Sequence, residues 1–538
     1  MAPRVVRSAC RCSRRRRRRR CRSPRRCAGP NGRPVSASLP SRPRRTRPAL
    51  RLDELLGRAG LPAPPACGIE IAGLTADSRA VRPGFLFAAL PGAKADGRAF
   101  IAQAVAQGAA AVLAPAGTAW PEGVPVRPLL AEPDPRRALA LLAAAQDGLQ
   151  PATVVAVTGT NGKTSTVDFL RQLWVLDGAR AASLGTLGLV AEGLPPGPSL
   201  TTPDPVALHA QLAMLARAGF GHAAMEASSH GIEQRRLDGV RLTAAGFTNL
   251  TRDHLDYHGT MEAYRAAKLR LFETLLPAGA TAVVNADMDA ETLEAIRAIA
   301  AQRGLRLVTV GAAGTDLRLL AQQPLPDGQA LELEAHGTRH ALRLALPGRF
   351  QADNALMALA LAVAAGMPAD RALAHLPHLA GVRGRMELAA RLPNGAAAYV
   401  DYAHTPDGLA TLLRSLRPHV APGGALHVVF GAGGDRDPGK RPLMGAACAA
   451  HADRAWVTDD NPRSEDPALI RAAVLAGCPG GVDAGDRRAA IAAALSALGP
   501  GDVLAVAGKG HESGQTIRGV TTPFDDVAVV RALTGGAA

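Results

Sequence analysis

The segment TGTNGKTST at residues 158–166 combines residue types and spacing that suit phosphate binding. It follows the apolar run VVAV and precedes a stretch in which apolar residues recur at helical spacing. Glycines let backbone N–H groups approach phosphate oxygens, and the N-terminus of the following helix adds positive potential. We therefore predict that Lys163 contacts the outer phosphates of a nucleotide and that the Thr164 hydroxyl binds Mg²⁺. A chance glycine-rich turn is the alternative, which the register of strand, loop and helix disfavours.

The glycine spacing of this loop is shorter than in most P-loops. The common pattern G-x-x-x-x-G-K-T would need glycine at position 157, where valine stands. The pattern present is G-x-x-G-K-T, which disfavours motor proteins, GTPases and small-molecule kinases. The sequence TGTNGKT resembles the signature of the Mur ligase and folylpolyglutamate synthetase superfamily.

The formal net charge of +16 belongs to the N-terminal segment. Residues 1–50 contain 18 Arg and no acidic residue, and without them 44 basic residues face 46 acidic ones. The remaining net charge of −2 gives no excess of positive charge for nucleic acid. We predict that the Arg/Pro/Ser-rich residues 1–48 are a disordered extension. A nucleic-acid or anionic-lipid arm, a transit-like peptide and a mis-set translation start are the alternatives.

The cysteines and the hydropathy pattern indicate the compartment. Cys67, Cys448 and Cys478, which follow the Arg-rich segment, are widely scattered and show neither metal-ligand spacing nor a disulfide framework. No apolar run is long enough to span a membrane, and the Arg-rich segment lacks the apolar region of a secretory signal. We expect a cytoplasmic monomer that binds small molecules, without membrane insertion or nucleic-acid binding.

From residue 49 onward, apolar strands alternate with helical patterns. FLFAAL at 85–90 reads as a strand, and FIAQAVAQGAAAVLAP at 100–115 reads as helix, glycine turn and strand. The alternation continues to about residue 383. A further set follows with AAAYVDYAH, ALHVVFGAGG, AWVTDDNP and DVLAVAGKG. This pattern predicts an α/β fold with parallel sheets covered on both faces.

Residues 50–538 resemble the diaminopimelate-adding Mur ligases. The segments that carry the resemblance are, in chain order, ADSRAVRPGFLFAALPGAKADG, TGTNGKT, LTTPDP, MEASSHGIEQRRL, TNLTRDHLDYHGTMEAYRAAKLRLF, LPGRFQADNALMALALA, GGDRDPGKRP, DDNPR and GKGHE. The resemblance implies a small α/β UDP-binding domain at 49–147 and a central P-loop-type ATPase domain with a parallel sheet at 148–383. A Rossmann-like, amino-acid-binding domain is implied at 384–538.

The activity that the resemblance implies is ATP-dependent amide formation in peptidoglycan precursor synthesis. The D-glutamyl side-chain carboxylate of UDP-N-acetylmuramoyl-L-alanyl-D-glutamate would form an acyl phosphate, which an amino group of meso-diaminopimelate would attack. ATP, two Mg²⁺ ions and an N6-carboxylysine at position 268 are expected. The alternatives are the same ligase using L-lysine, a folylpolyglutamate or cyanophycin synthetase-like ligase, and a nucleic-acid-binding P-loop protein.

The resemblance also assigns site residues. The expected ATP-binding residues are Gly159, Thr160, Asn161, Gly162, Lys163, Thr164, Asn354 and Arg385. The expected catalytic residues are Lys163, Lys268, Glu226 and His254, and the expected metal ligands are Thr164, Glu226, His254 and the Lys268 carbamate. The UDP-muramoyl dipeptide would contact Ala76, Ser78, Ala93, Lys94, Ala95, Thr201, Thr202, Ser228, Gln234 and Arg236.

Lys268 is also unusual on the helical pattern alone. Tyr264, Lys268, Leu271 and Leu275 fall on one stripe of the predicted helix, and a lysine on an apolar stripe is costly unless it is paired, modified or snorkelling. We favour carbamylation, as in the resembling family, over a snorkelling surface lysine.

The expected diaminopimelate site uses segments that follow apolar strands in the last domain. Its residues are Arg436, Asp460, Asn461, Pro462, Arg463, Gly508 and Glu512. Ligands of open parallel sheets bind beyond the carboxyl ends of the strands. The Arg463 guanidinium suits the distal carboxylate of diaminopimelate, which lysine lacks, and Glu512 would receive the distal ammonium. A salt-bridged turn residue is the alternative reading of Arg463.

Overall fold

The structure is a computed structural model that describes residues 49–535, apart from 63–67, 93–94, 196, 198–199, 326–327 and 336. The Arg-rich segment 1–48, Cys67 and two expected UDP-site residues, Ala93 and Lys94, lie outside the described residues. Within the described part of the chain, no helix is long and apolar enough to cross a membrane.

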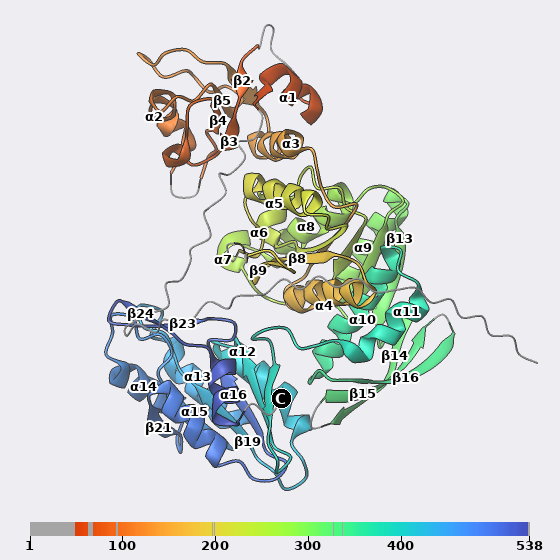
Figure 1. Cartoon of the computed structure of the whole chain (residues 1–538), viewed down its shortest axis with the longest axis vertical. Coiled ribbons are helices and arrows are strands. Elements are labelled where there is room, and N and C mark those ends of the chain that lie inside the picture. The colour runs from red at the N-terminus through yellow and green to blue at the C-terminus, as the bar shows by residue number, and fades with distance from the viewer. Residues whose placement is uncertain are drawn as a thin grey trace, which may run out of the picture. The chain divides into compact units, whose positions relative to one another are not determined.

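A four-stranded parallel sheet, ordered β3-β4-β5-β6, forms the first α/β unit (Figure 1). Leu86 and Ala88 face one core with helices α1 and α3, whereas Phe87 and Ala89 face another with α2. Its elements are β1 (Leu50–Arg51), α1 (Leu52–Ala59), β2 (Glu70–Ile71), β3 (Gly73–Thr75), η1 (Ser78–Ala80), β4 (Phe85–Ala88), η2 (Gly97–Phe100), α2 (Ile101–Ala106), β5 (Ala111–Pro115), β6 (Leu129–Glu132) and α3 (Pro135–Asp147).

The second sheet has ten strands in the order β16-β15-β14-β13-β12-β11-β7-β10-β8-β9. Its strands are β7 (Thr153–Thr158), β8 (Ala181–Gly185), β9 (Gly188–Ala191), β10 (His222–Glu226), β11 (Ala244–Phe247), β12 (Thr281–Asn285), β13 (Arg306–Gly311), β14 (Leu317–Leu325), β15 (Gly328–Ala335) and β16 (Thr338–Leu344). Its helices are α4 (Lys163–Leu176), α5 (Pro205–Arg217), α6 (Ser229–Glu233), α7 (Leu255–His258), α8 (Met261–Arg270), η3 (Leu271–Leu275), α9 (Ala290–Arg303), α10 (Arg349–Ala364), α11 (Ala369–His375) and η4 (Leu376–His378).

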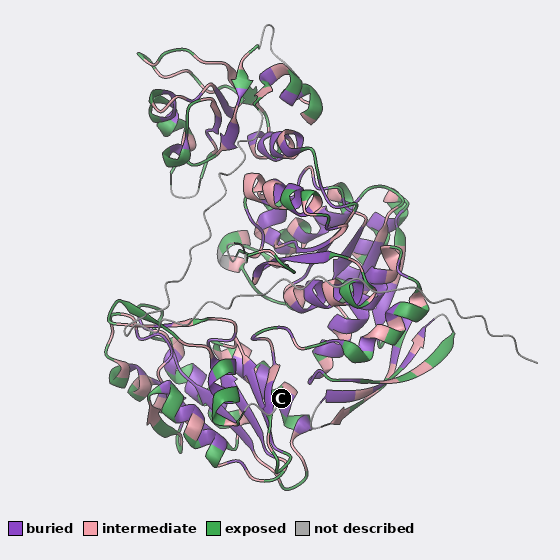
Figure 2. Cartoon of the chain, in the orientation of Figure 1, coloured by how far each residue is buried: buried purple, intermediate pink, exposed green. Residues whose placement is uncertain are grey.

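Helices cover both faces of this sheet, as the sequence predicts. Val155 and Val157 of β7 pack in a core with α4 and α10, and Val154 and Ala156 pack in the opposite core with α5, α8 and α9. The buried strands and the inner faces of these helices are purple in Figure 2.

The prediction of helix–strand alternation as far as residue 383 is wrong for residues 317–344. Strands β14, β15 and β16 form an antiparallel meander there, and β9 adds an antiparallel strand at the other edge. Antiparallel neighbours can be joined by short turns, so no crossover helix is needed between them. The strands at both edges of the sheet therefore pair in antiparallel fashion, whereas the strands in its centre are parallel.

The position of β7 explains where a ligand can bind. The chain runs from β7 to β8 on one side of the sheet and later crosses to β11 on the other, so β7 lies between β10 and β11. Ligands of open α/β sheets bind at such a switch point, beyond the carboxyl ends of the strands. The loop that follows β7 lies at this point.

The third sheet, in the order β17-β18-β22-β19-β20-β21, is parallel except for β17. All four strands expected from the C-terminal apolar segments are present, as β18, β19, β20 and β22. The elements are β17 (Glu387–Arg391), β18 (Ala397–Asp401), α12 (Pro406–Leu416), η5 (Arg417–His419), β19 (Leu426–Phe430), α13 (Lys440–His451), β20 (Arg454–Thr458), α14 (Pro467–Leu475), β21 (Val482–Gly485), α15 (Arg487–Ser496), β22 (Val503–Ala507), β23 (Gly514–Ile517), β24 (Val520–Pro523) and α16 (Asp526–Leu533).

Candidate active site

The predicted phosphate loop connects β7 to α4, as expected. Gly159 and Gly162 have φ angles of 145° and 83°, in the region that favours glycine. A Cβ at Gly159 would clash with the Thr248 hydroxyl, and one at Gly162 would clash with the Asn354 amide. The loop backbone therefore lies against two distant segments. One of them carries Asn354, the residue expected to border the nucleotide.

We expect Gly162→Ala to weaken the binding of an ATP analogue by at least about tenfold, because the new methyl group must displace Asn354 and the loop backbone is strained. Isothermal titration calorimetry measures this change. Gly178→Ala is the matched control, since Gly178 has a similar φ of 85° but no atom within 4 Å of the added Cβ. This control should lower thermal stability slightly and leave nucleotide affinity unchanged. Equal loss of affinity in both variants would contradict the role of the Asn354 contact.

Two lysines converge on the carbonyl oxygen of Gly159. The Lys163 ammonium donates to the carbonyls of Gly159 at 2.8 Å and Thr160 at 2.9 Å, and the Lys268 ammonium donates to Gly159 at 2.8 Å. Burial lowers the pKa of Lys163, although the carboxylates of Glu226 and Asp253 oppose the effect. The phosphate loop is thus contacted by two amino groups that come from different helices, α4 and α8.

Lys268 is a buried residue, so its reading as a snorkelling surface lysine is wrong. Its side chain is 1% exposed and lies over the Tyr264 ring, with Nζ 4.5 Å from the ring centre. Burial and the nearby charge of Lys163 hold the pKa of Lys268 well below its ordinary value. The predicted stripe continues through Leu271, but the π-helical turn η3 leaves Leu275 only partly buried.

Glu226 ends strand β10 beside the phosphate loop. Its carboxylate is buried and accepts hydrogen bonds from the Thr164 hydroxyl at 2.9 Å and from the Thr186 backbone N–H at 2.7 Å. The Thr186 hydroxyl donates to the second carboxylate oxygen at 3.2 Å. The expected metal ligands Thr164 and Glu226 are therefore neighbours.

These residues fit a hard divalent cation that shares its coordination with phosphates and water. Such an ion needs only one or two carboxylates from the protein, and Glu226 with the Thr164 hydroxyl provides that minimum. No group of three or more His, Cys, Asp or Glu side chains that could hold a metal ion occurs among the described residues. Glu226 and Thr164 therefore suit an ion whose remaining ligands come from a nucleotide and water.

His254 lies at the same site but has a strained backbone. Its φ of 51° is unusual for a residue other than glycine, and its side chain is 48% exposed. The ring centre lies 5.0 Å from that of His230 and 6.1 Å from that of Tyr264. An exposed imidazole at a strained position is consistent with a ligand-binding role and does not resemble a core histidine.

A cavity of about 400 Å³ brings together most of the residues predicted to bind ATP or to act in catalysis, with some of those predicted for the UDP-muramoyl dipeptide. The predicted residues that line it are Thr160, Asn161, Gly162, Lys163, Thr164, Thr201, Thr202, Glu226, Ser228, Arg236, His254, Lys268 and Arg385. The predictions missed Thr186, His230 and Tyr264, which also line it. Nothing in the sequence spacing indicated Thr186, since only the pairing of β8 with β10 brings it near Glu226.

The residues expected to bind the UDP-muramoyl dipeptide divide into two groups. Thr201, Thr202 and Ser228 line the first cavity, whereas Ala76 and Gln234 line a second cavity of about 660 Å³. Arg236 lines both cavities, and it donates to the Thr202 carbonyl at 2.6 Å and to the Gln234 side chain at 2.7 Å. Ser78 and Ala95 line neither cavity. The buried Ser78 hydroxyl instead donates to Gln103 at 3.2 Å.

The expected diaminopimelate residues gather where strands β19, β20 and β22 end. The Arg463 guanidinium donates to the Gly434 carbonyl at 2.7 Å, and no carboxylate among the described residues forms an ion pair with it. The reading of Arg463 as a salt-bridged turn residue therefore finds no support in the described part of the chain. Pro462 and Asn461 are buried beside it, and Arg436 is exposed.

Glu512 has partners within the protein that the sequence did not reveal. One of its carboxylate oxygens accepts from the Lys509 ammonium at 3.0 Å and from the Asn461 amide at 2.9 Å. Burial raises the pKa of Glu512, but these hydrogen bonds outweigh it, so that its pKa lies below the ordinary value. Glu512 is thus held as a carboxylate at the predicted amino-acid site.

Comparison with known proteins identifies the family. The family model described as "Mur ligase middle domain" matches residues 157–362. Those described as "Mur ligase, glutamate ligase domain" and "Mur ligase family, catalytic domain" match residues 384–510 and 70–146. A protein of Caulobacter vibrioides named UDP-N-acetylmuramoyl-L-alanyl-D-glutamate--2,6-diaminopimelate ligase is 57% identical over 90% of this chain and 99% of its own length. The chain belongs to the Mur ligase family.

Other Mur ligases extend this comparison. A protein of the same name from Chelativorans sp. is 52% identical over 86% of this chain and 94% of its own. A solved structure with that name is 34% identical, has a TM-score of 0.69 and covers 90% of this Mur ligase and 99% of that chain. A folylpolyglutamate synthase of Mycobacterium tuberculosis complexed with ADP shares the fold at 21% identity, with a TM-score of 0.55 and 69% of this chain covered.

Proposed function

We propose that this Mur ligase uses ATP to join meso-diaminopimelate to the D-glutamyl side-chain carboxylate of UDP-N-acetylmuramoyl-L-alanyl-D-glutamate. The observation that carries the proposal is the convergence of Lys163, Lys268 and Glu226 on a phosphate loop inside one cavity. The close relatives that bear this activity in their names support the choice of substrates. The proposed reaction is a cytoplasmic one, because it uses ATP and a nucleotide-linked substrate.

The first step transfers the γ-phosphoryl group of ATP. A carboxylate oxygen of the substrate attacks the γ-phosphorus, the bond to the β–γ bridging oxygen breaks, and an acyl phosphate and ADP form. Lys163 neutralises charge on the transferred group, and the glycine loop positions the phosphates through its N–H groups. Thr164 and Glu226 would hold Mg²⁺, which supplies additional charge neutralisation when bound.

The second step forms the amide bond. The free amine of diaminopimelate attacks the acyl carbon, and phosphate leaves from the tetrahedral intermediate. Arg463 binds the distal carboxylate of diaminopimelate, and Glu512 shares its charge between Lys509 and the distal ammonium. No enzyme nucleophile is required, because positioning and charge stabilisation supply the catalysis.

The proposal is tested with purified protein, UDP-N-acetylmuramoyl-L-alanyl-D-glutamate and ATP, by following phosphate release. We expect release with meso-diaminopimelate and at least tenfold less with L-lysine at equal concentration, since lysine lacks the carboxylate for Arg463. Absence of turnover with diaminopimelate contradicts the proposal, and equal turnover with lysine would indicate the lysine-adding alternative.

Carbamylation of Lys268 is a separate part of the proposal. Its amino group is buried against Gly159, and burial favours the neutral amine that reacts with CO₂. The carbamate would be an anion close to Lys163, where it could help to hold Mg²⁺. Incubation with ¹³C-bicarbonate should give a carbamate signal in ¹³C NMR that is absent from Lys268→Met. A Lys440→Met control should retain it, and a wild-type protein without the signal contradicts carbamylation.

A further inference from the structure

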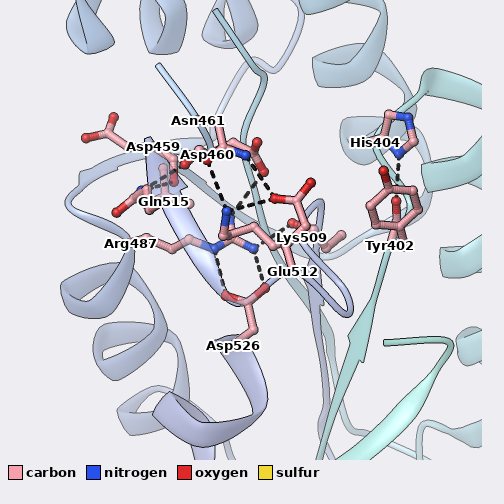
Figure 3. Close-up of polar contacts among 12 residues, drawn as sticks. Tyr402, His404, Asp459, Asp460, Asn461, Arg487, Lys509, Glu512, Gln515 and Asp526 are labelled. Carbon is pink, nitrogen blue, oxygen red and sulfur yellow. Dashed lines mark hydrogen bonds and ion pairs between the residues drawn. The ribbon is translucent and has the colours of Figure 1, made fainter. Parts of the chain in front are cut away.

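Arg487 is a fully buried arginine beneath the predicted amino-acid site. It begins helix α15, and its side chain is 0% exposed. Its Nε and one terminal nitrogen donate to the two carboxylate oxygens of Asp526 at 2.8 and 2.7 Å, and the same terminal nitrogen donates to the Ala507 carbonyl at 2.9 Å. Asp526 lies below Arg487 in Figure 3 and is itself fully buried. This pair fixes the guanidinium at the end of strand β22.

The other terminal nitrogen of Arg487 faces Asp460. The two groups form an ion pair of 4.0 Å between NH1 and Oδ2, and neither atom has a hydrogen-bond partner among the described residues. Gly508 lies against the same carboxylate, because a Cβ there would come within 2.6 Å of Asp460 Oδ2. Asp460 is therefore confined between Arg487 and the backbone that leads to Glu512.

The loop that contains Asp460 is held by further buried contacts. The Gln515 amide donates to the Asp460 carbonyl at 2.8 Å, and the Lys509 ammonium bridges Asn461 at 3.2 Å and Glu512 at 3.0 Å (Figure 3). Lys509 is fully buried, like Arg487. Two buried cations thus lie beside the buried carboxylate of Asp460 and the partly exposed carboxylate of Glu512.

We propose that Arg487, anchored by Asp526, is a positioning residue that keeps the Asp460 carboxylate ionised and oriented toward the ammonium group of the amino-acid substrate. This inference rests on the proposed function and adds to it a residue that lies outside the DNPR and GKGHE segments. A buried carboxylate keeps its charge only when a cation compensates the lost hydration. Lys509 compensates Glu512, and Arg487 does the same for Asp460.

The groups around Asp460 define the expected pH dependence. Burial holds the pKa of Asp460 above its ordinary value, and the carboxylates of Glu512 and Asp526 also raise it, whereas Arg487 and Lys509 lower it and so oppose the effect of burial. Lys440 and Tyr402 also interact electrostatically with Asp460. Removing Arg487 should raise the pKa of Asp460 further, so that its carboxylate becomes protonated at a higher pH. Removing the charge of Asp526 should instead lower the pKa of Asp460.

The test is the pH profile of kcat/KM for meso-diaminopimelate in the full-length protein, with ATP and the UDP substrate saturating. For Arg487→Gln we expect the acid limb to move to higher pH, with kcat/KM roughly tenfold below wild type at pH 6 and approaching it at high pH. For Asp526→Asn we expect the acid limb to move to lower pH, because the Asp526 charge raises the pKa of Asp460. The apparent pKa of the acid limb belongs to Asp460 and Glu512 together, because the two carboxylates interact.

Arg487→Gln leaves Asp526 buried without its partner and can fail to fold. The double variant Arg487→Gln/Asp526→Asn removes both charges, and we expect its limb to move to higher pH, by less than in the single variant. If Arg487 had a purely structural role, the variants would have a lower melting temperature, and their activity would fall by the same factor at every pH. An acid limb of the double variant that coincides with the wild-type limb would overturn the inference while leaving the proposed function intact. A wild-type protein inactive with diaminopimelate would overturn both.

Discussion

Replacing Lys163 with alanine is expected to lower kcat by about 10³-fold, which is the largest single effect predicted for this Mur ligase. The Lys163 ammonium lies at the start of α4 and is the group that can follow the charge on the γ-phosphoryl group as it is transferred. The loss should fall mainly on kcat, because the glycine loop and helix N-terminus still bind the ground-state phosphates. Phosphate release in the complete reaction measures this.

Arg171→Ala is the matched control for Lys163→Ala. Arg171 lies on the same helix, pairs with Asp168 at 2.8 Å and does not line the 400 Å³ cavity. Removing this cation should change kcat by less than about twofold, because Arg171 does not line the cavity and the Gln172 amide still donates to Asp168 at 2.8 Å. If Lys163→Ala keeps more than about a tenth of wild-type kcat while its fold is intact, phosphate charge stabilisation does not depend on this residue.

Replacing Arg463 with alanine is expected to raise KM for diaminopimelate by about 10- to 100-fold, the range for losing a charge-assisted, bidentate contact. The loop should keep its shape, because backbone bonds hold it. The Arg463 N–H donates to the Thr516 carbonyl at 3.0 Å, and the Arg518 N–H donates to the Arg463 carbonyl at 2.6 Å. The affinity for ATP and for the UDP substrate should not change. The preference for diaminopimelate over L-lysine should fall by a similar factor, because only diaminopimelate carries the second carboxylate.

Arg518→Ala provides the control for Arg463→Ala. Both arginines have left-handed backbones, with φ of 49° at Arg518 and 55° at Arg463, and they are joined by a backbone hydrogen bond. The Arg518 side chain is exposed, so its removal should leave KM for diaminopimelate unchanged. Arg463→Lys should recover little, since an ammonium cannot make two parallel hydrogen bonds. An unchanged KM in Arg463→Ala would contradict the specificity argument.

The sequence predicted the parts of the site that depend on local patterns. The strand, glycine loop and helix around Lys163 follow from apolar periodicity and from glycine at the two positive-φ positions 159 and 162. The same local signals predicted β18, β19, β20 and β22 but missed the antiparallel meander of residues 317–344. Alternation between buried and exposed residues describes a half-solvated strand, but it does not reveal which neighbour that strand pairs with.

By itself, then, the sequence determined the phosphate loop, the α/β class and the presence of a lysine on an apolar stripe. Only the tertiary structure decided that Lys268 reaches the Gly159 carbonyl, 109 residues away in the chain, and that Glu226 meets the Thr164 hydroxyl. It also decided that Lys509 pairs with Glu512 and that Arg487 lies beneath Asp460. The reason is physical. Residue type and spacing determine local backbone geometry, whereas the partner of a buried charge depends on the order of the strands in the sheet. Strand order places β7 between β10 and β11, and β22 between β18 and β19.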